Sequence, residues 1–190
     1  MLLQPPRRLF IGLLPDRAVQ LRIQRHARDW TWPQDARPTR FGRYHLTLHF
    51  LGNEVGAAPE MRLRAVLREV AAQPMELLLE MPQSWQKNGV AVLRPREHSG
   101  LRELRERIAQ CLPHRCRCPP FTPHITLARN AVGATAPSTG PDICWAVSDF
   151  LLVWSRLDTR PAEYVVLERF GLRGGGAIKA KAATQGSLFD

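Results

Sequence analysis

The chain has 190 residues, 44% of them hydrophobic, which is enough to bury a core in one domain or two small lobes. Lysine and arginine total 27 against 17 acidic residues. The resulting net charge of +10 favours a polyanionic partner such as RNA, although genomic base composition can also produce an arginine-rich protein. No run reaches the roughly 18 apolar residues of a membrane span, and the N-terminus lacks a secretory signal's apolar segment, so we expect a cytoplasmic protein.

The first half of the chain alternates apolar, strand-like runs with amphipathic helical patterns. Proline and glycine mark the ends of these segments, and Asp16 stands where a helix N-cap is expected. In chain order, the pattern predicts a strand over 8–14, a helix beginning after Asp16, a loop over 30–40, a strand over 44–51 and a helix over 59–72. The chain therefore opens with a strand, a helix and a second strand.

The second half repeats this order loosely. The pattern predicts a hairpin of strands 76–81 and 89–93 with a turn at Pro82, Asn88 and Gly89, a helix over 99–112, a strand containing 125–127, and closing strands over 148–155 and 163–170. The resulting order is βαβαββαβββ. We therefore predict an α+β fold of two similar lobes, each an antiparallel sheet with helices on the outer side, related by pseudo-twofold symmetry around a central cleft.

One domain is expected to hold both lobes. This single bilobal domain is predicted to span residues 1–173, because the strand and helix patterns continue to about that point. Residues 174–190 begin with three glycines and continue with lysines and small residues, a composition typical of a flexible C-terminal tail.

Two nearly identical tetrads carry the main functional signal. They are His45-Leu46-Thr47-Leu48 and His124-Ile125-Thr126-Leu127, and they lie 79 residues apart. Because side chains alternate along a strand, the His and Thr of each tetrad project from one face and the apolar residues face the core. The duplication predicts a shared, pseudo-twofold site between the lobes.

Paired histidines suit phosphoryl transfer without a metal. With an ordinary pKa of about 6.5, one imidazole can act as a base while the other acts as an acid. Two Thr hydroxyls can hold the non-bridging phosphate oxygens, and Arg129 can offset the negative charge. Arg129 has the wrong strand parity to share a face with His124 and Thr126, so its participation requires a strand end or a β-bulge.

The tetrads and their flanks resemble the two-histidine phosphoesterases, and among them the RNA 2′,3′-cyclic phosphodiesterases also called 2′-5′ RNA ligases. The resemblance covers most of the chain. It includes Arg8-Leu9-Phe10-Ile11, the first tetrad continued by His49-Phe50-Leu51-Gly52, and the second tetrad preceded by Phe121-Thr122-Pro123 and followed by Ala128-Arg129.

The resemblance implies hydrolysis of a 2′,3′-cyclic phosphate at an RNA end to a 2′-phosphomonoester, with 2′-5′ ligation as a minor activity. It implies no metal and no other cofactor, an RNA partner such as a tRNA fragment, and a monomer. His45 would be the proton donor and His124 the proton acceptor, roles that the near-symmetric tetrads alone do not distinguish. Thr47 and Thr126 would hold the phosphate. Phe10 would be either a base-stacking platform or a core residue.

Other interpretations stay open beside this one. The same fold could hydrolyse a small cyclic nucleotide or a 2′-5′ oligoadenylate, and a non-catalytic RNA-end binding protein could use the same cleft. His49 is expected to be peripheral, because Ala128 occupies the matching position of the second tetrad, and His26, His98 and His114 are expected on the surface. Zinc is not expected at Cys111, His114, Cys116 and Cys118, because the Cys-x-Cys spacing is too tight. The four cysteines, which include Cys144, are too few for a disulfide scaffold and are predicted to be free thiols.

Overall fold

The structure, a computed structural model, describes residues 7–113, 121–156 and 163–173. The helices are α1 (Arg17–Arg28), α2 (Ala57–Leu67), α3 (Ser99–Cys111) and the short 3₁₀ helix η1 (Gln86–Asn88). The strands are β1 (Arg7–Leu13), β2 (Arg37–Pro38), β3 (Leu46–Val55), β4 (Met75–Trp85), β5 (Val90–Pro95), β6 (Ile125–Arg129), β7 (Ile143–Val147), β8 (Asp149–Arg156) and β9 (Glu163–Gly171). The predicted C-terminal tail lies outside the described residues.

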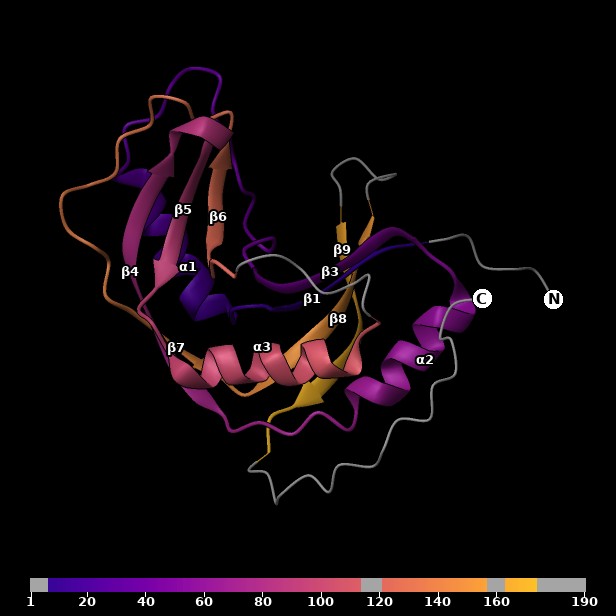
Figure 1. The fold of residues 1–190 in the computed structure, drawn as a ribbon. Coiled ribbons are helices and arrows are strands. Elements are labelled where there is room, and N and C mark those ends of the chain that lie inside the picture. Colours follow the sequence, from indigo (N-terminus) through magenta and orange to yellow (C-terminus); the bar gives the residue numbers. More distant parts are fainter. Residues whose placement is uncertain (1–6, 114–120, 157–162, 174–190) are drawn as a thin grey trace.

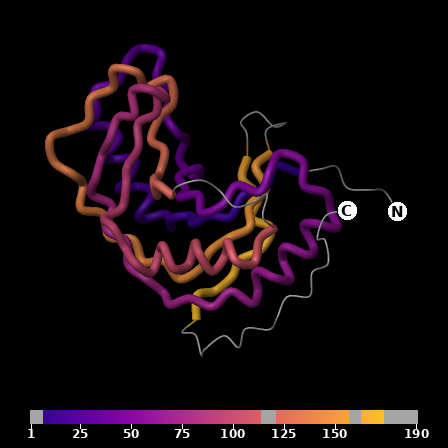
Figure 2. Tube along the Cα trace, viewed as in Figure 1, coloured from indigo at the N-terminus to yellow at the C-terminus, as the bar shows by residue number. Residues whose placement is uncertain are grey.

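Two antiparallel four-stranded lobes meet along the two tetrad strands. In the described residues the strand order is β7-β4-β5-β6-β3-β1-β8-β9, and β2 pairs with β6. The lobes are joined at one register pair, Leu46 with Ile125. Figure 1 shows β4, β5 and β6 diverging from β1, β3 and β8 like the arms of a V, with α2 and α3 along its outer side, and the trace in Figure 2 follows the same shape. The predicted two-lobed α+β fold is confirmed.

The lobes repeat the same strand order outward from their junction. β6 is followed by β5 and then β4, while β3 is followed by β1 and then β8. β6 pairs with β5, with α3 between them in the chain, and β3 pairs with β1, with α1 and the two-residue β2 between them. Each of these helices packs against the opposite lobe. α1 follows β1 in the chain but contacts β7, and α3 follows β5 but contacts β3. This exchange gives the arrangement its pseudo-twofold character.

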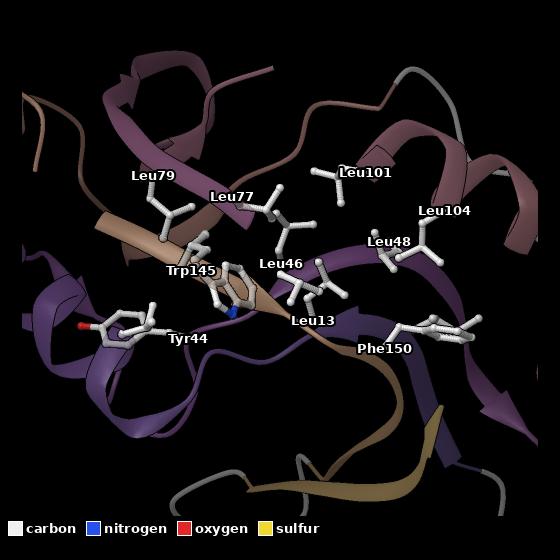
Figure 3. Close-up of a cluster of buried hydrophobic side chains, with 14 of the residues drawn as sticks. Leu13, Tyr44, Leu46, Leu48, Leu77, Leu79, Leu101, Leu104, Trp145 and Phe150 are labelled. Atoms are coloured by element: carbon white, nitrogen blue, oxygen red, sulfur yellow. The ribbon is translucent and has the colours of Figure 1, made fainter. Parts of the chain in front are cut away.

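A continuous core extends across both lobes. Leu46 and Ile125 are fully buried at the junction, and Leu13 lies beside Leu46. Figure 3 shows side chains from β4 and β7, including Trp145, on one side of this centre and Phe150 from β8 on the other. All belong to one buried cluster. Because burial of apolar side chains is the main favourable contribution to folding, the shared core fixes the two tetrads relative to each other.

Several predicted boundaries were wrong, each for a local reason. Strand β4 continues through Pro82 to Trp85, and the turn lies at η1. Pro82 is tolerated because β7 pairs with β4 only as far as Leu79, so one edge of β4 is open beyond that point. Helix α2 ends five residues before its predicted end, at Leu67. The sequence prediction also missed β7, although Ile143, Trp145 and Val147 alternate with exposed residues.

The histidine His26 was predicted on the surface and is buried. It is 5% exposed, and its Nε2 accepts a hydrogen bond from Trp30 Nε1 at 3.2 Å. Burial lowers the pKa of His26, which favours the neutral ring that this hydrogen bond requires. His26 is therefore a core residue of α1.

Replacing Gly12 by Ala is expected to destabilise the junction of the lobes. A Cβ atom at Gly12 would lie 2.7 Å from the backbone carbonyl oxygen of Leu46 and 3.1 Å from the Phe10 ring. We expect a loss of about 1–3 kcal/mol, as for other overpacked sites, measured by denaturant unfolding. Gly171→Ala is the matched control, because nothing lies within 4 Å of its added Cβ. Equal stability of the two variants would contradict this packing argument.

Candidate active site

The two tetrad histidines are held in the same way. Nδ1 of His45 donates to the backbone carbonyl of Arg43 at 2.9 Å, and Nδ1 of His124 donates to the carbonyl of Thr122 at 2.8 Å. A carbonyl oxygen only accepts hydrogen bonds, so Nδ1 keeps its proton in both rings. Nε2 is therefore the atom that gains or loses a proton in each histidine.

A β-bulge after each tetrad threonine decides where the following residues point. Val92 on β5 pairs with Thr126, whereas the adjacent Ala91 pairs with Ala128, so the bulge lies at Leu127. Leu127 and Ala128 are consequently both buried in the core. The bulge shifts the strand parity and places Arg129 on the face of Thr126, as the sequence analysis required for its participation.

The first tetrad strand carries the same bulge at Leu48. Gly12 pairs with Thr47, whereas Ile11 pairs with His49. His49 is turned into the interior, where it is 1% exposed and Nε2 contacts the Arg105 carbonyl oxygen at 2.9 Å. This buried contact with α3 explains why His49 does not share the site of His45.

A pocket of about 270 Å³ lies at the tetrads. It brings together three predicted site residues, His45, Thr126 and Arg129. The other residues that line it are Arg37, Pro38, Thr39, Arg40, Arg43, Asn130 and Tyr164. Thr47 and His124 do not line this pocket. His124 is nevertheless close to His45, because Leu46 and Ile125, the residues that follow them, are register partners. A positive charge on His124 accordingly lowers the pKa of His45.

Burial and positive charge disfavour the imidazolium form of both histidines. The pKa of His45 is lowered to about 4, chiefly because burial removes water from the charged ring, and further by the charges of Arg43, His124 and Arg129. The pKa of His124 is also lowered, first by burial and then by Arg129 and Arg94. The carbonyl hydrogen bonds oppose these shifts without cancelling them. The free site therefore favours neutral rings at neutral pH.

Aromatic rings pack against both histidines. The centroid of His45 lies 4.9 Å from that of Phe10 and 5.1 Å from that of Tyr164. On the other lobe, the centroids of His124 and Trp85 are 4.7 Å apart. These contacts restrict the two imidazoles to the orientations that their carbonyl hydrogen bonds select.

Phe10 is a buried residue of this packing. It is 5% exposed, and its ring contacts His45 and Tyr164. The structure therefore favours the core alternative of the sequence analysis over an open base-stacking platform. Tyr164 is half-buried and lines the pocket, and it is stacked against Arg43, whose guanidinium lies 4.4 Å from the Tyr164 ring centroid.

Sequence reasoning missed much of the pocket wall. Arg37, Arg40 and Arg43 lie in or next to a segment that was predicted as a loop, and no tetrad marks them. Arg37 reaches the site because β2 pairs with β6, with Arg37 directly opposite Arg129. A two-residue strand leaves no periodic signal. The one available hint was the concentration of arginine just before the first tetrad.

The remaining predictions concern metals, thiols and membranes. In the described residues, no three or more His, Cys, Asp or Glu side chains come together as a metal site. Cys111 and Cys144 are free thiols, as predicted, while His114, Cys116 and Cys118 lie outside the described residues. Among the helices that the structure describes, none has the length and apolar character needed to cross a membrane.

Comparison with known proteins then identifies the family. The family model of the 2′-5′ RNA ligase superfamily matches residues 15–165, which include both tetrads, both bulges and the pocket. The chain belongs to this superfamily. Within the superfamily, it is 33% identical over 174 residues to an RNA 2′,3′-cyclic phosphodiesterase of Escherichia coli, covering 88% of this chain and 97% of the relative.

A second relative and a solved structure agree with this assignment. An RNA 2′,3′-cyclic phosphodiesterase of Thermus thermophilus is 35% identical over 150 residues, covering 68% of this chain and 72% of the relative. A solved structure of E. coli LigT complexed with phosphate has a TM-score of 0.78 and 27% identity, covering 89% of this chain and 99% of LigT. The structural similarity therefore extends over nearly the whole LigT chain.

Proposed function

We propose that this chain hydrolyses the 2′,3′-cyclic phosphodiester at an RNA end to a 2′-phosphomonoester, without a metal ion. The observation that carries the proposal is that His45 and His124 are oriented in the same way. In each ring Nδ1 is hydrogen-bonded to a backbone carbonyl, which leaves Nε2 to exchange a proton. The relatives named RNA 2′,3′-cyclic phosphodiesterase support the reaction, and the LigT structure complexed with phosphate supports phosphate binding in this fold.

In the proposed reaction, Nε2 of His124 takes a proton from water as the water oxygen attacks phosphorus. The bond from phosphorus to the 3′ oxygen breaks, and Nε2 of His45 gives its proton to that oxygen. The 2′ oxygen keeps the phosphate. Thr47 and Thr126 donate hydrogen bonds to the non-bridging oxygens, and Arg129 offsets their charge. Each turnover moves one proton from His45 to the product and one from water to His124, so a proton must return to His45 before the next cycle.

Ligation uses the same groups with a different nucleophile. If the 5′ hydroxyl of a second RNA replaces water, the new bond joins that 5′ oxygen to phosphorus, and the product is a 2′-5′ linkage. Because water is present at far higher concentration, hydrolysis is the main reaction. We further infer that the enzyme is monomeric and cytoplasmic and that its partner is RNA. The basic composition supports the RNA partner.

Product analysis tests this function directly. An RNA oligonucleotide with a 2′,3′-cyclic phosphate is expected to gain the mass of one water, measured by mass spectrometry. A free cyclic mononucleotide and a 2′-5′ oligoadenylate serve as competing substrates, and faster turnover of either would replace RNA as the substrate. Salt-sensitive binding of the oligonucleotide with no mass change would instead identify an RNA-end binding protein.

The pH dependence of kcat/KM is expected to be shifted toward acid. The active free enzyme carries one proton on the histidine pair, and both pKa values are lowered below 6.5, that of His45 to about 4. Lowered pKa values mean that this proton is lost at lower pH, so kcat/KM should fall by about tenfold per pH unit above pH 6.5, as for loss of one essential proton. A flat profile between about pH 6.5 and 8 would contradict this account.

The corresponding kcat profile provides an internal comparison. A bound phosphate anion favours the imidazolium form, so the basic limb of kcat should lie at higher pH than that of kcat/KM. Arg129→Gln removes a positive charge that lowers the pKa of both histidines. This variant should therefore move the basic limb of kcat/KM toward higher pH.

A further inference from the structure

The pocket contains more positive charge than one cyclic phosphate requires. Arg37, Arg40, Arg43 and Arg129 all line it, and its lining includes no aspartate or glutamate. Across residues 7–113, 121–156 and 163–173, no ion pair joins any of these four arginines to a carboxylate. Several arginines elsewhere are paired with a carboxylate, as Arg96 is with Glu80. No carboxylate of the described residues therefore offsets the pocket charge, which leaves it available to an anionic ligand.

The four arginines fall into two groups by the segments that carry them. Arg43 and Arg129 belong to the tetrads' immediate surroundings, because the Arg43 carbonyl accepts the hydrogen bond from Nδ1 of His45 and Arg129 follows the bulge of the second tetrad strand. Arg37 and Arg40 lie on or next to β2, outside both tetrad strands, yet they line the same pocket. A cyclic phosphodiester carries a single negative charge, which Arg43 and Arg129 can offset without help from the other pair.

The backbone holds Arg37 and Arg40 in place. Arg37 on β2 lies directly opposite Arg129 on β6, and the Thr39 amide donates to the Leu127 carbonyl at 2.7 Å. Leu127 is the bulged residue, so the segment 37–40 is anchored to the same irregularity that turns Arg129 into the site. Two like charges directly opposite each other in an antiparallel pair are destabilising. An anion between or over Arg37 and Arg129 relieves that repulsion.

We propose that Arg37 and Arg40 form a subsite for the phosphate on the 5′ side of the terminal nucleotide. This inference rests on the proposed function. An RNA that ends in a 2′,3′-cyclic phosphate has no nucleotide beyond that end, so its next phosphate is the one that joins the terminal nucleoside to its predecessor. The guanidinium groups bind phosphate oxygens through charge-assisted hydrogen bonds. The pocket therefore favours RNA ends over free nucleoside 2′,3′-cyclic phosphates that lack a 5′ phosphate.

Two small substrates isolate this contact. They are adenosine 2′,3′-cyclic phosphate with a 5′ hydroxyl and the same compound with a 5′ phosphate. We expect the 5′ phosphate to raise kcat/KM by about tenfold or more, mainly through KM, as expected for gaining charged hydrogen bonds. In the double variant Arg37→Gln, Arg40→Gln, the ratio between the two substrates should fall to near one.

A matched control separates this effect from net charge. The double variant Arg28→Gln, Arg62→Gln removes the same charge from exposed arginines of α1 and α2, outside the pocket, and should leave the substrate ratio at the wild-type value. Equal kcat/KM for the two substrates in wild type, or an unchanged ratio in the double variant, would overturn the subsite. If the wild-type enzyme hydrolyses neither substrate nor the RNA oligonucleotide, the proposed function fails, and the subsite fails with it.

Discussion

Replacing either His45 or His124 by Ala should lower kcat by about 10²–10⁴-fold, the usual contribution of one positioned acid or base. Each ring is fixed by a carbonyl hydrogen bond and packed against aromatic rings, so each Nε2 is already oriented before substrate binds. Single-turnover kinetics with an RNA that ends in a 2′,3′-cyclic phosphate measures the loss.

The two histidine variants should also lose opposite limbs of the pH profile. Removing the acid abolishes the fall in rate at high pH, and removing the base abolishes the fall at low pH. This difference assigns the roles that the near-symmetric tetrads leave open. His98→Ala is the matched control, because His98 precedes α3 and its side chain forms no cap hydrogen bond. Wild-type rates in either tetrad variant would remove paired histidine catalysis from the mechanism.

The second large effect is expected at the tetrad threonines. Thr47→Val and Thr126→Val keep the side-chain shape and remove the hydroxyl donor. If the hydroxyls hold the non-bridging oxygens as charge develops, kcat should fall by about 10²–10³-fold, as for loss of one donor to a developing oxyanion. Because valine suits a half-buried strand position, unfolding by denaturant should be little changed.

The division between kcat and KM distinguishes this role from simple binding. A donor that serves substrate and transition state equally changes KM alone, whereas a donor specific to the transition state changes kcat. Thr31→Val, at an exposed threonine outside both tetrad strands and outside the pocket lining, is the control and should match wild type. A rise in KM with unchanged kcat in both tetrad variants would assign the threonines to ground-state binding.

The tetrads could be found from the sequence because their signal is local and repeated. Alternation along a strand correctly placed Leu46 and Ile125 in the core and the polar residues on the opposite face. The same alternation fails beyond the threonines, because a bulge adds one residue to each strand. His49 and Arg129 therefore lie on the faces opposite to those that simple parity predicts.

The pocket wall depends on pairings between segments far apart in the chain. Arg37 reaches the site through a two-residue strand, and Tyr164 reaches it from β9, the last strand of the other lobe. Neither has a sequence pattern that distinguishes it from other surface arginines or strand aromatics. The sequence left two interpretations of Phe10 open. Phe10 is buried against His45 because β1 lies between β3 and β8 in the sheet.

The measurement that tests the central claim most directly is ³¹P NMR of a short RNA ending in a 2′,3′-cyclic phosphate, incubated in EDTA with the wild-type protein and with the His45→Ala and His124→Ala variants. We predict that the wild type alone converts the cyclic phosphate to a 2′-phosphomonoester. A 3′-phosphate product, an unchanged cyclic phosphate with wild type, or conversion by either variant at the wild-type rate would contradict proton transfer by the paired histidines.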